Sequence, residues 1–205
     1  MIRENTMSVN HPTFETPRLI LRPFDPQDAK LLHSILNQEK ILQYFPGSSS
    51  PSLERVGALI QRQLTHWESH GFGWWAVQPR QHTELIGWNG LQYLPDTDEV
   101  EIGYLFSKPF WGGGLATEGA RVGIRFGFET LGLQTIVGIV HPENTASAHV
   151  LEKLGMTCTG PAVYFEMDVL RYEVGREEWR MGESANERGG EKAGKRKKAS
   201  QRRIG

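Results

Sequence analysis

The chain has 205 residues, of which 38% are hydrophobic and 23% charged, a composition typical of one globular domain with a tail. Its one cysteine, Cys158, excludes an intrachain disulfide and an all-thiolate metal site. No apolar run approaches the roughly 20 residues of a membrane span, and the first residues lack the apolar stretch of a signal peptide. These features predict a cytoplasmic protein with no membrane partner.

The formal net charge of −1 is unevenly distributed along the chain. Residues 183–205 carry eight Lys or Arg and three Glu, which leaves the remainder strongly acidic. This segment has no aromatic residue, so we expect a disordered basic tail, preceded by a domain at 13–182 and a flexible N-terminus at 1–12. A solvated tail is the favoured interpretation, and a weak contact with RNA or another polyanion is the alternative.

The first half of the chain predicts a strand followed by two helices. Asp25 and Pro26 are typical of a helix start, Ser50 followed by Pro51 opens the second helix, and Gly71 ends it. The expected elements are a strand at 18–24, a helix at 25–37, a loop at 45–52 and a helix that reaches residue 71.

The second half alternates between periods typical of strands and of helices. Asn144 is a candidate cap for one of its helices, and Gly132 and Gly155 are candidate helix stops. We expect strands at 74–78, 83–93, 99–106, 135–141, 156–159 and 167–176, and helices at 115–131 and 144–155. This order indicates one mixed α/β domain.

Three consecutive glycines stand in "PFWGGGLATEGA", between a predicted strand and a predicted helix. A helix N-terminus offers unpaired N–H groups and a partial positive charge, and glycines in front of it let an anion approach. We therefore expect an anion site, most simply for a pyrophosphate; a tight turn that needs positive φ is the alternative. Neither a P-loop nor a dinucleotide fingerprint fits, because no Lys follows Gly114 and Thr117 stands where a third glycine belongs.

The segment "EIGYLFSKPFWGGGLATEGA" resembles the acyl-coenzyme A signature of the GNAT superfamily of N-acetyltransferases, and within it the Rim-type branch of ribosomal-protein N-terminal acetyltransferases. Supporting pieces follow the same order along residues 16–179: "TPRLILRPF", "ELIGWNGL", "HPENTASAHVLEKLGM" and "MDVLRYEVGREEW". The resemblance implies a single GNAT-like α/β (α+β) domain, with a mixed, mostly antiparallel sheet and helices on both faces. It also implies acetyl-CoA as the co-substrate.

The superfamily pattern Gln/Arg-x-x-Gly-x-Gly/Ala falls on residues 111–116, with Trp111 in place of Gln or Arg. The resemblance implies that the N–H groups of Gly112, Gly114, Leu115 and Ala116 hold the pyrophosphate, while pantetheine pairs with the strand near residues 104–106. The full expected set for the co-substrate is Tyr104, Leu105, Phe106, Gly112, Gly113, Gly114, Leu115, Ala116, Thr117, Asn144 and Ser147.

Asn144 and Ser147 are three residues apart and share one face of a predicted helix start. In the superfamily, this Asn contacts coenzyme A, and many members carry a Tyr seven residues later as the general acid. Leu151 stands at that place here and cannot donate a proton. The resemblance to the Rim-type branch implies that Ser147 takes the role; an ordinary helix cap and a small first-turn residue are the alternatives.

Glu99 and Glu101 fall on one face of a predicted strand, with Tyr104 on the other. A solvated strand face is the common fate of alternating carboxylates. In the family match, the Glu before "IGY" lies beside the acceptor, so Glu101 is the candidate base, Glu99 the second candidate, and a role in positioning water or substrate is left open.

Two further groups of residues have a functional and a structural interpretation. His66 and His70 have a spacing that suits zinc on a helix, but no third ligand is nearby, so we expect surface histidines and no metal. Trp74, Trp75 and Trp88 are expected in the core, and an acceptor pocket is the alternative.

The sequence thus predicts an N-acetyltransferase that transfers acetyl directly from acetyl-CoA to a primary amine, because Cys158 lies in no recognisable nucleophile context. The expected acceptor is the α-amine of a protein or peptide N-terminus, or a small amine such as an antibiotic or polyamine. A non-catalytic acyl-CoA sensor is the alternative, and both a monomer and a homodimer are compatible with the sequence.

Overall fold

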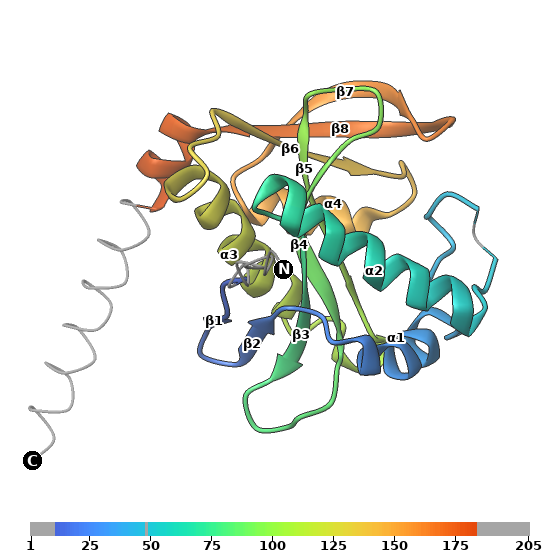
Figure 1. The fold of residues 1–205 in the computed structure, drawn as a ribbon. Helices are drawn as coiled ribbons and strands as arrows, with labels where there is room; N and C mark the ends of the chain where they lie inside the picture. The colour runs from blue at the N-terminus through green and yellow to red at the C-terminus, as the bar shows by residue number, and fades with distance from the viewer. Residues whose placement is uncertain (1–10, 48, 184–205) are drawn as a thin grey trace, which may run out of the picture.

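The computed structural model describes residues 11–47 and 49–183, and its centre is one eight-stranded sheet (Figure 1). The strands are β1 Phe14–Glu15, β2 Leu19–Arg22, β3 Trp74–Pro79, β4 Gly87–Tyr93, β5 Val100–Phe106, β6 Thr135–Val140, β7 Thr157–Tyr164 and β8 Met167–Gly175. Their spatial order is β1-β2-β3-β4-β5-β6-β8-β7, and β5 with β6 is the parallel pair among antiparallel neighbours. The mixed, mostly antiparallel sheet is confirmed.

Helices cover both faces of this sheet (Figure 1). They are α1 Ala29–Leu36, α2 Leu53–His70, α3 Leu115–Glu129 and α4 Thr145–Lys153, with 3-10 turns at Pro26–Asp28 and Lys108–Phe110. The first two pack on one face, and α3 and α4 pack on the other. Among the described residues, no helix combines the length and the apolar character needed to cross a membrane.

Local sequence chemistry accounts for most helix ends. Asp25 caps the turn before α1, since its carboxylate accepts a hydrogen bond from the N–H of Gln27 while Asp28 accepts from the N–H of Asp25. Gly71 ends α2 in the left-handed conformation with φ 74°. The cap of α2 is Ser52, so the expectation that Ser50 opens this helix is wrong by two residues.

Two strands differ from the sequence prediction. The two-residue β1 was not expected, and β7 continues to Tyr164 although its predicted end is residue 159. β7 is an edge strand with mostly exposed side chains and a register shift between Cys158 and Gly160. It therefore lacks the apolar alternation by which strands are predicted.

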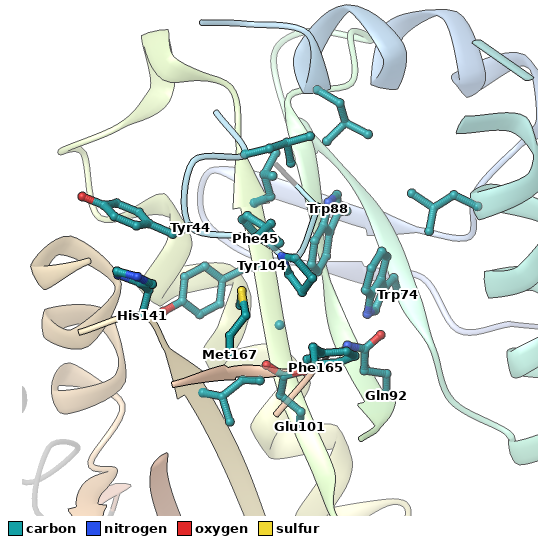
Figure 2. A pocket seen from close by; sticks show the side chains of 18 of the residues that line it. Tyr44, Phe45, Trp74, Trp88, Gln92, Glu101, Tyr104, His141, Phe165 and Met167 are labelled. Carbon is teal, nitrogen blue, oxygen red and sulfur yellow. Dashed lines mark hydrogen bonds between the residues drawn. The ribbon is translucent and has the colours of Figure 1, made fainter. Parts of the chain in front are cut away.

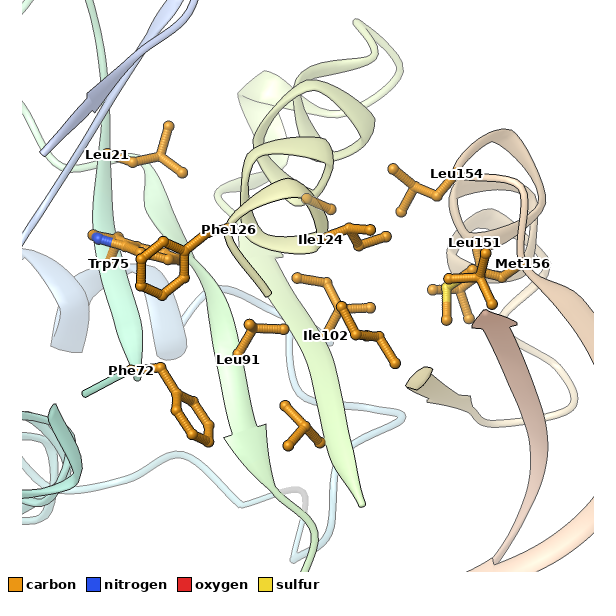
Figure 3. Close-up of a cluster of buried hydrophobic side chains, with 14 of the residues drawn as sticks. Leu21, Phe72, Trp75, Leu91, Ile102, Ile124, Phe126, Leu151, Leu154 and Met156 are labelled. Carbon is orange, nitrogen blue, oxygen red and sulfur yellow. The ribbon is translucent and has the colours of Figure 1, made fainter. Parts of the chain in front are cut away.

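The larger core cluster lies between the sheet and the pair α3 and α4 (Figure 3). Ile124 and Phe126 of α3 face Trp75 and Ile102 of the sheet, and Leu151 of α4 packs beside them. Gly123 lets α3 approach closely, because a Cβ there would lie 2.7 Å from Ile102 Cδ1. This packing fixes α3 and α4 against β5 and β6, where the candidate site lies.

The end of the described chain is helical from residue 176 to 183. Glu183, which the sequence assigns to the tail, forms ion pairs with Arg121 and, at 3.0 Å, with Arg125 of α3. The predicted flexible N-terminus, except residues 11 and 12, and the rest of the basic tail lie outside the described residues.

Candidate active site

The site begins where β5 and β6 separate. β4 pairs with β5 at seven positions, whereas β5 and β6 share one register pair, Glu101 with Val137. A cavity of about 860 Å³ opens beside this divergence. Residues from α2, β5, β6, α4 and the turn between β7 and β8 line it, so the sheet, both helical layers and a hairpin meet here (Figure 2).

Glu101 is a buried carboxyl group in this cavity, with 7% of its surface exposed. Gln92 Nε2 donates to its Oε2 at 2.9 Å, and the backbone N–H of Ile139 donates to the same carboxylate. Burial raises the pKa of Glu101 to about 7, although both hydrogen bonds act in the opposite direction. The solvated strand face that the sequence allowed is therefore wrong for Glu101, which is poised to exchange a proton near neutral pH.

Glu99 lies in a different environment. Its carboxylate pairs with Arg171 Nη2 at 2.7 Å and accepts a short hydrogen bond from the Tyr164 hydroxyl. Burial acts to raise the pKa of Glu99, but these two partners outweigh it and hold the pKa below its usual value. Glu99 is absent from the cavity lining and ties the β7–β8 hairpin to the start of β5.

Tyr104 reaches the cavity from the opposite face of β5. Glu101 is in register with Gln92, and Tyr104 with Asn89, so the two side chains leave the strand on opposite sides, as the sequence predicted. Both line the cavity at the divergence of β5 and β6 (Figure 2). The Tyr104 hydroxyl donates to the carbonyl oxygen of Ser147 at 3.1 Å, and burial raises its pKa, so this group remains a neutral phenol.

The start of α4 forms another part of the lining. Asn144 caps this helix, because its Oδ1 accepts a hydrogen bond from the N–H of Ser147 at 3.2 Å. Both side chains line the cavity, and the Ser147 hydroxyl makes no hydrogen bond to any described residue. Leu151, one to two turns further along, is fully buried and lies beneath them.

The glycine loop lies at the N-terminus of α3. Gly112 and Gly114 have φ of 75° and 76°, so the turn itself requires two of the three glycines. Gly113 has no such requirement, and open space surrounds the place of its Cβ. The N–H groups of residues 112–117 donate to no described group, since the first bond of the helix runs from the N–H of Glu118 to the carbonyl oxygen of Gly114. Six free donors at one helix end suit a phosphate ligand.

Aromatic side chains form a wall of the cavity. Trp74 and Trp88 stack in parallel with ring centroids 3.7 Å apart and line the cavity together with Tyr44 and Phe45 (Figure 2). Trp75 points to the other face and is fully buried in the core. The core interpretation is thus confirmed for Trp75, whereas Trp74 and Trp88, although buried, also belong to the cavity.

The predicted site residues fall into three groups. Those that line the cavity are Glu101, Tyr104, Leu105, Asn144 and Ser147. The glycine loop with Leu115, Ala116 and Thr117 lies beyond the end of β5, and Phe106 packs in the core. Gln92 and Phe165 also line the cavity and were not expected, because neither stands in a recognisable motif.

His66 and His70 lie together on α2 with ring centroids 4.6 Å apart. His66 Nδ1 lies 2.6 Å from the carbonyl oxygen of Phe72, which commits this nitrogen as a donor. Burial lowers the pKa of His66, so the ring is neutral at pH 7. Within residues 11–47 and 49–183, no group of three potential metal ligands occurs.

The sequence profile of the acetyltransferase (GNAT) domain matches residues 18–157, about two thirds of the chain. This chain belongs to the GNAT acetyltransferase family. The resemblance seen in the glycine loop is therefore confirmed, and the chain is an N-acetyltransferase of a family that uses acetyl-CoA.

Three relatives of this GNAT chain illustrate the match. The uncharacterized N-acetyltransferase YoaA of Bacillus subtilis is 31% identical over 150 residues, which cover 73% of this chain and 85% of YoaA. Spermidine N(1)-acetyltransferase of Escherichia coli K12 is 26% identical over 149 residues, which cover 70% of this chain and 75% of that enzyme. The crystal structure of an acetyltransferase from Agrobacterium tumefaciens is 30% identical, with a TM-score of 0.70, and covers 80% of this chain and 94% of that one.

Proposed function

We propose that this enzyme acetylates an α-amine, that of a protein or peptide N-terminus or of a similar small molecule, by direct transfer from acetyl-CoA. The observation that carries the proposal is Glu101, a buried carboxyl group with a pKa of about 7 inside the cavity. A base whose pKa lies near the working pH is well matched to accept a proton from an amine that is itself partly neutral at that pH.

The co-substrate has a matching place beside the cavity. The N–H groups of Gly112, Gly114, Leu115 and Ala116 are free to donate to the pyrophosphate, and α3 adds its partial positive charge. From there, pantetheine extends along β5 at residues 104–106, where β6 has diverged and leaves backbone groups for a ligand. Its thioester end reaches the cavity near Asn144, which caps α4.

The chemical step follows from the groups around the divergence. The neutral amine attacks the thioester carbonyl carbon, a C–N bond forms, and the C–S bond breaks to release the thiol. The carboxylate of Glu101 takes the proton that the amine loses, directly or through a water. The Ser147 hydroxyl, which has no hydrogen-bond partner among the described residues, donates a hydrogen bond to the departing thiolate. The proton that completes the thiol comes from solvent, to which Glu101 returns the proton that it took from the amine. The Tyr104 hydroxyl is engaged with the Ser147 carbonyl oxygen and keeps the start of α4 in place.

The preference for an α-amine rests on proton affinity. An α-amine has a pKa of about 7.7–8.0, close to that of Glu101, whereas a lysine amine has a pKa near 10.4. The proton transfer from an α-amine to Glu101 is therefore nearly balanced, while that from a lysine is uphill by about three pKa units.

The test measures thiol release from acetyl-CoA with two acceptor peptides. One peptide has a free α-amine and no lysine, and the other has a blocked N-terminus and a single lysine. We expect kcat/KM for the first to exceed that for the second by at least about tenfold at pH 7.5. A preference for the lysine peptide would refute the α-amine assignment, and the absence of any thiol release would favour the acyl-CoA sensor.

Other expectations stay predictions beside this proposal. They are a cytoplasmic location, a weak polyanion contact of the basic tail, and a monomer or homodimer. A small-molecule acceptor such as a polyamine is the alternative substrate, because spermidine N(1)-acetyltransferase is among the relatives.

A further inference from the structure

The turn between β7 and β8 has an unusual backbone. Tyr164 pairs with Met167, so Phe165 and Glu166 form a two-residue hairpin turn. Both have positive φ, 52° and 60°. Such turns normally carry Asn or Gly, and a bulky side chain in this conformation is strained. Backbone strain at two positions of one turn indicates that a side chain of this turn has a function.

The side chain that this turn presents lies in the cavity. Phe165 lines it together with Met167 and Val169, and Figure 2 shows Phe165 and Met167 on the same side of the cavity as Glu101. Phe165 remains 38% exposed, so a ligand has apolar surface to cover there. Glu166, the other residue of the turn, is absent from the lining.

Side-chain hydrogen bonds hold the β7–β8 hairpin against β5. Arg171 of β8 donates to Glu99 Oε1 through two nitrogens at 2.7 and 3.1 Å, and Tyr164 donates to the other oxygen of the same carboxylate. Glu99 precedes Glu101 by two residues. The contacts that hold the turn therefore also fix the distance between Phe165 and the candidate base.

The charges of the lining select against polycations. Among the described lining residues, Glu101 is the one carboxyl group, and Arg55 and Arg62 of α2 supply positive charge without an ion-pair partner in the described chain. A polyamine needs several carboxylates to replace its hydration. The rest of the wall combines aromatic and aliphatic side chains with polar ones, among them Gln63, Gln92, Asn144 and Ser147.

We infer that the acceptor carries a bulky apolar or aromatic group next to its reacting amine, and that Phe165, held by the strained turn, is the residue that selects this group. The inference rests on the proposed function and names its substrate class. For an α-amine acceptor, it predicts a large apolar first residue. Covering such a side chain is worth about ten- to a hundredfold in affinity.

The experiment compares three acceptors: the C-terminally amidated tripeptides Phe-Gly-Gly and Gly-Gly-Gly, and spermidine. We expect kcat/KM to fall in that order, with at least about a tenfold step between the two peptides. Glu166→Gly is the matched control, because it relaxes the turn and keeps Phe165. It should raise Tm by about 2–4 °C and leave the ratio between the peptides unchanged.

The decisive variant combines Phe165→Asn with Glu166→Gly, which gives the preferred Asn-Gly turn. We expect a Tm at or above that of the wild type, an unchanged KM for acetyl-CoA, and a ratio between the two peptides that falls to about threefold or less. A ratio that survives in this variant overturns the role of Phe165. Equal use of both peptides by the wild type overturns the inference and leaves the proposed function standing, whereas use of spermidine alone, or of no acceptor, overturns both.

Discussion

Substitution of Glu101 by Gln tests whether its burial sets the chemistry of the site. Burial raises the pKa of Glu101 from 4.5 to about 7. This difference corresponds to about 3 kcal/mol by which the folded state favours the protonated form over the carboxylate. Because the folded state prefers the protonated form, the unfolded chain loses this proton first as pH rises. The titration of Glu101 should therefore contribute a loss of about 3 kcal/mol to the free energy of unfolding of the wild type between pH 4.5 and pH 7, and no more above that.

The assay is denaturant unfolding of the wild type and Glu101→Gln at pH 4.5 and pH 8. Other carboxylates titrate alike in both proteins, so the difference between their free energies of unfolding isolates Glu101. We expect this difference to shift by about 3 kcal/mol in favour of the variant at pH 8. A difference that does not change with pH would refute the reasoning, because it would mean that the carboxylate is hydrated in the folded protein.

The activity of Glu101→Gln should change in the opposite sense to its stability. The variant should have a kcat/KM at pH 7 about a hundredfold below that of the wild type. A pH–rate profile should show this defect in activity shrinking toward pH 9, because the α-amine then deprotonates unaided. Ser147→Ala should lower kcat about tenfold with little change in the affinity for acetyl-CoA; an unchanged kcat would mean that water or another group serves the thiolate. Gly114→Glu should raise the KM for acetyl-CoA more than about tenfold, whereas Gly114→Gln, which strains the left-handed turn to a similar degree but carries no negative charge, should raise it far less; equal effects would assign the glycine to the turn alone. Arg171→Gln should raise the KM for the acceptor severalfold and leave the KM for acetyl-CoA unchanged, since the β7–β8 hairpin loses its link to Glu99. Steady-state kinetics with each substrate varied in turn measure both constants, and a raised KM for acetyl-CoA with an unchanged KM for the acceptor would contradict this prediction.

The backbone of the site was largely predictable from local chemistry. The glycines before α3, the Asn144 cap and the period of each major helix are signals carried by neighbouring residues. The identity of the co-substrate came from the family resemblance, because hydrophobic periodicity carries no information about ligands.

The environment of individual side chains was not predictable in this way. The alternating pattern of the strand does not distinguish Glu99 from Glu101, yet Glu99 pairs with Arg171, 72 residues away, and Glu101 is buried beside Gln92 and Ile139. Phe165 gave no signal because its turn lacks the glycine or asparagine by which such turns are recognised.

The single register pair between β5 and β6 makes the sheet two half-sheets, one of five strands and one of three, with α3 and α4 packed across the junction. In the described part of the chain, the backbone amides of β5 that face the gap beyond Glu101 have no partner strand, so they should exchange their protons with solvent quickly in the free enzyme. A co-substrate that lies along β5 would connect the two half-sheets in the way that an additional strand would. Deuterium uptake on both sides of the gap should then slow together on binding, including in β6, although the ligand lies along β5.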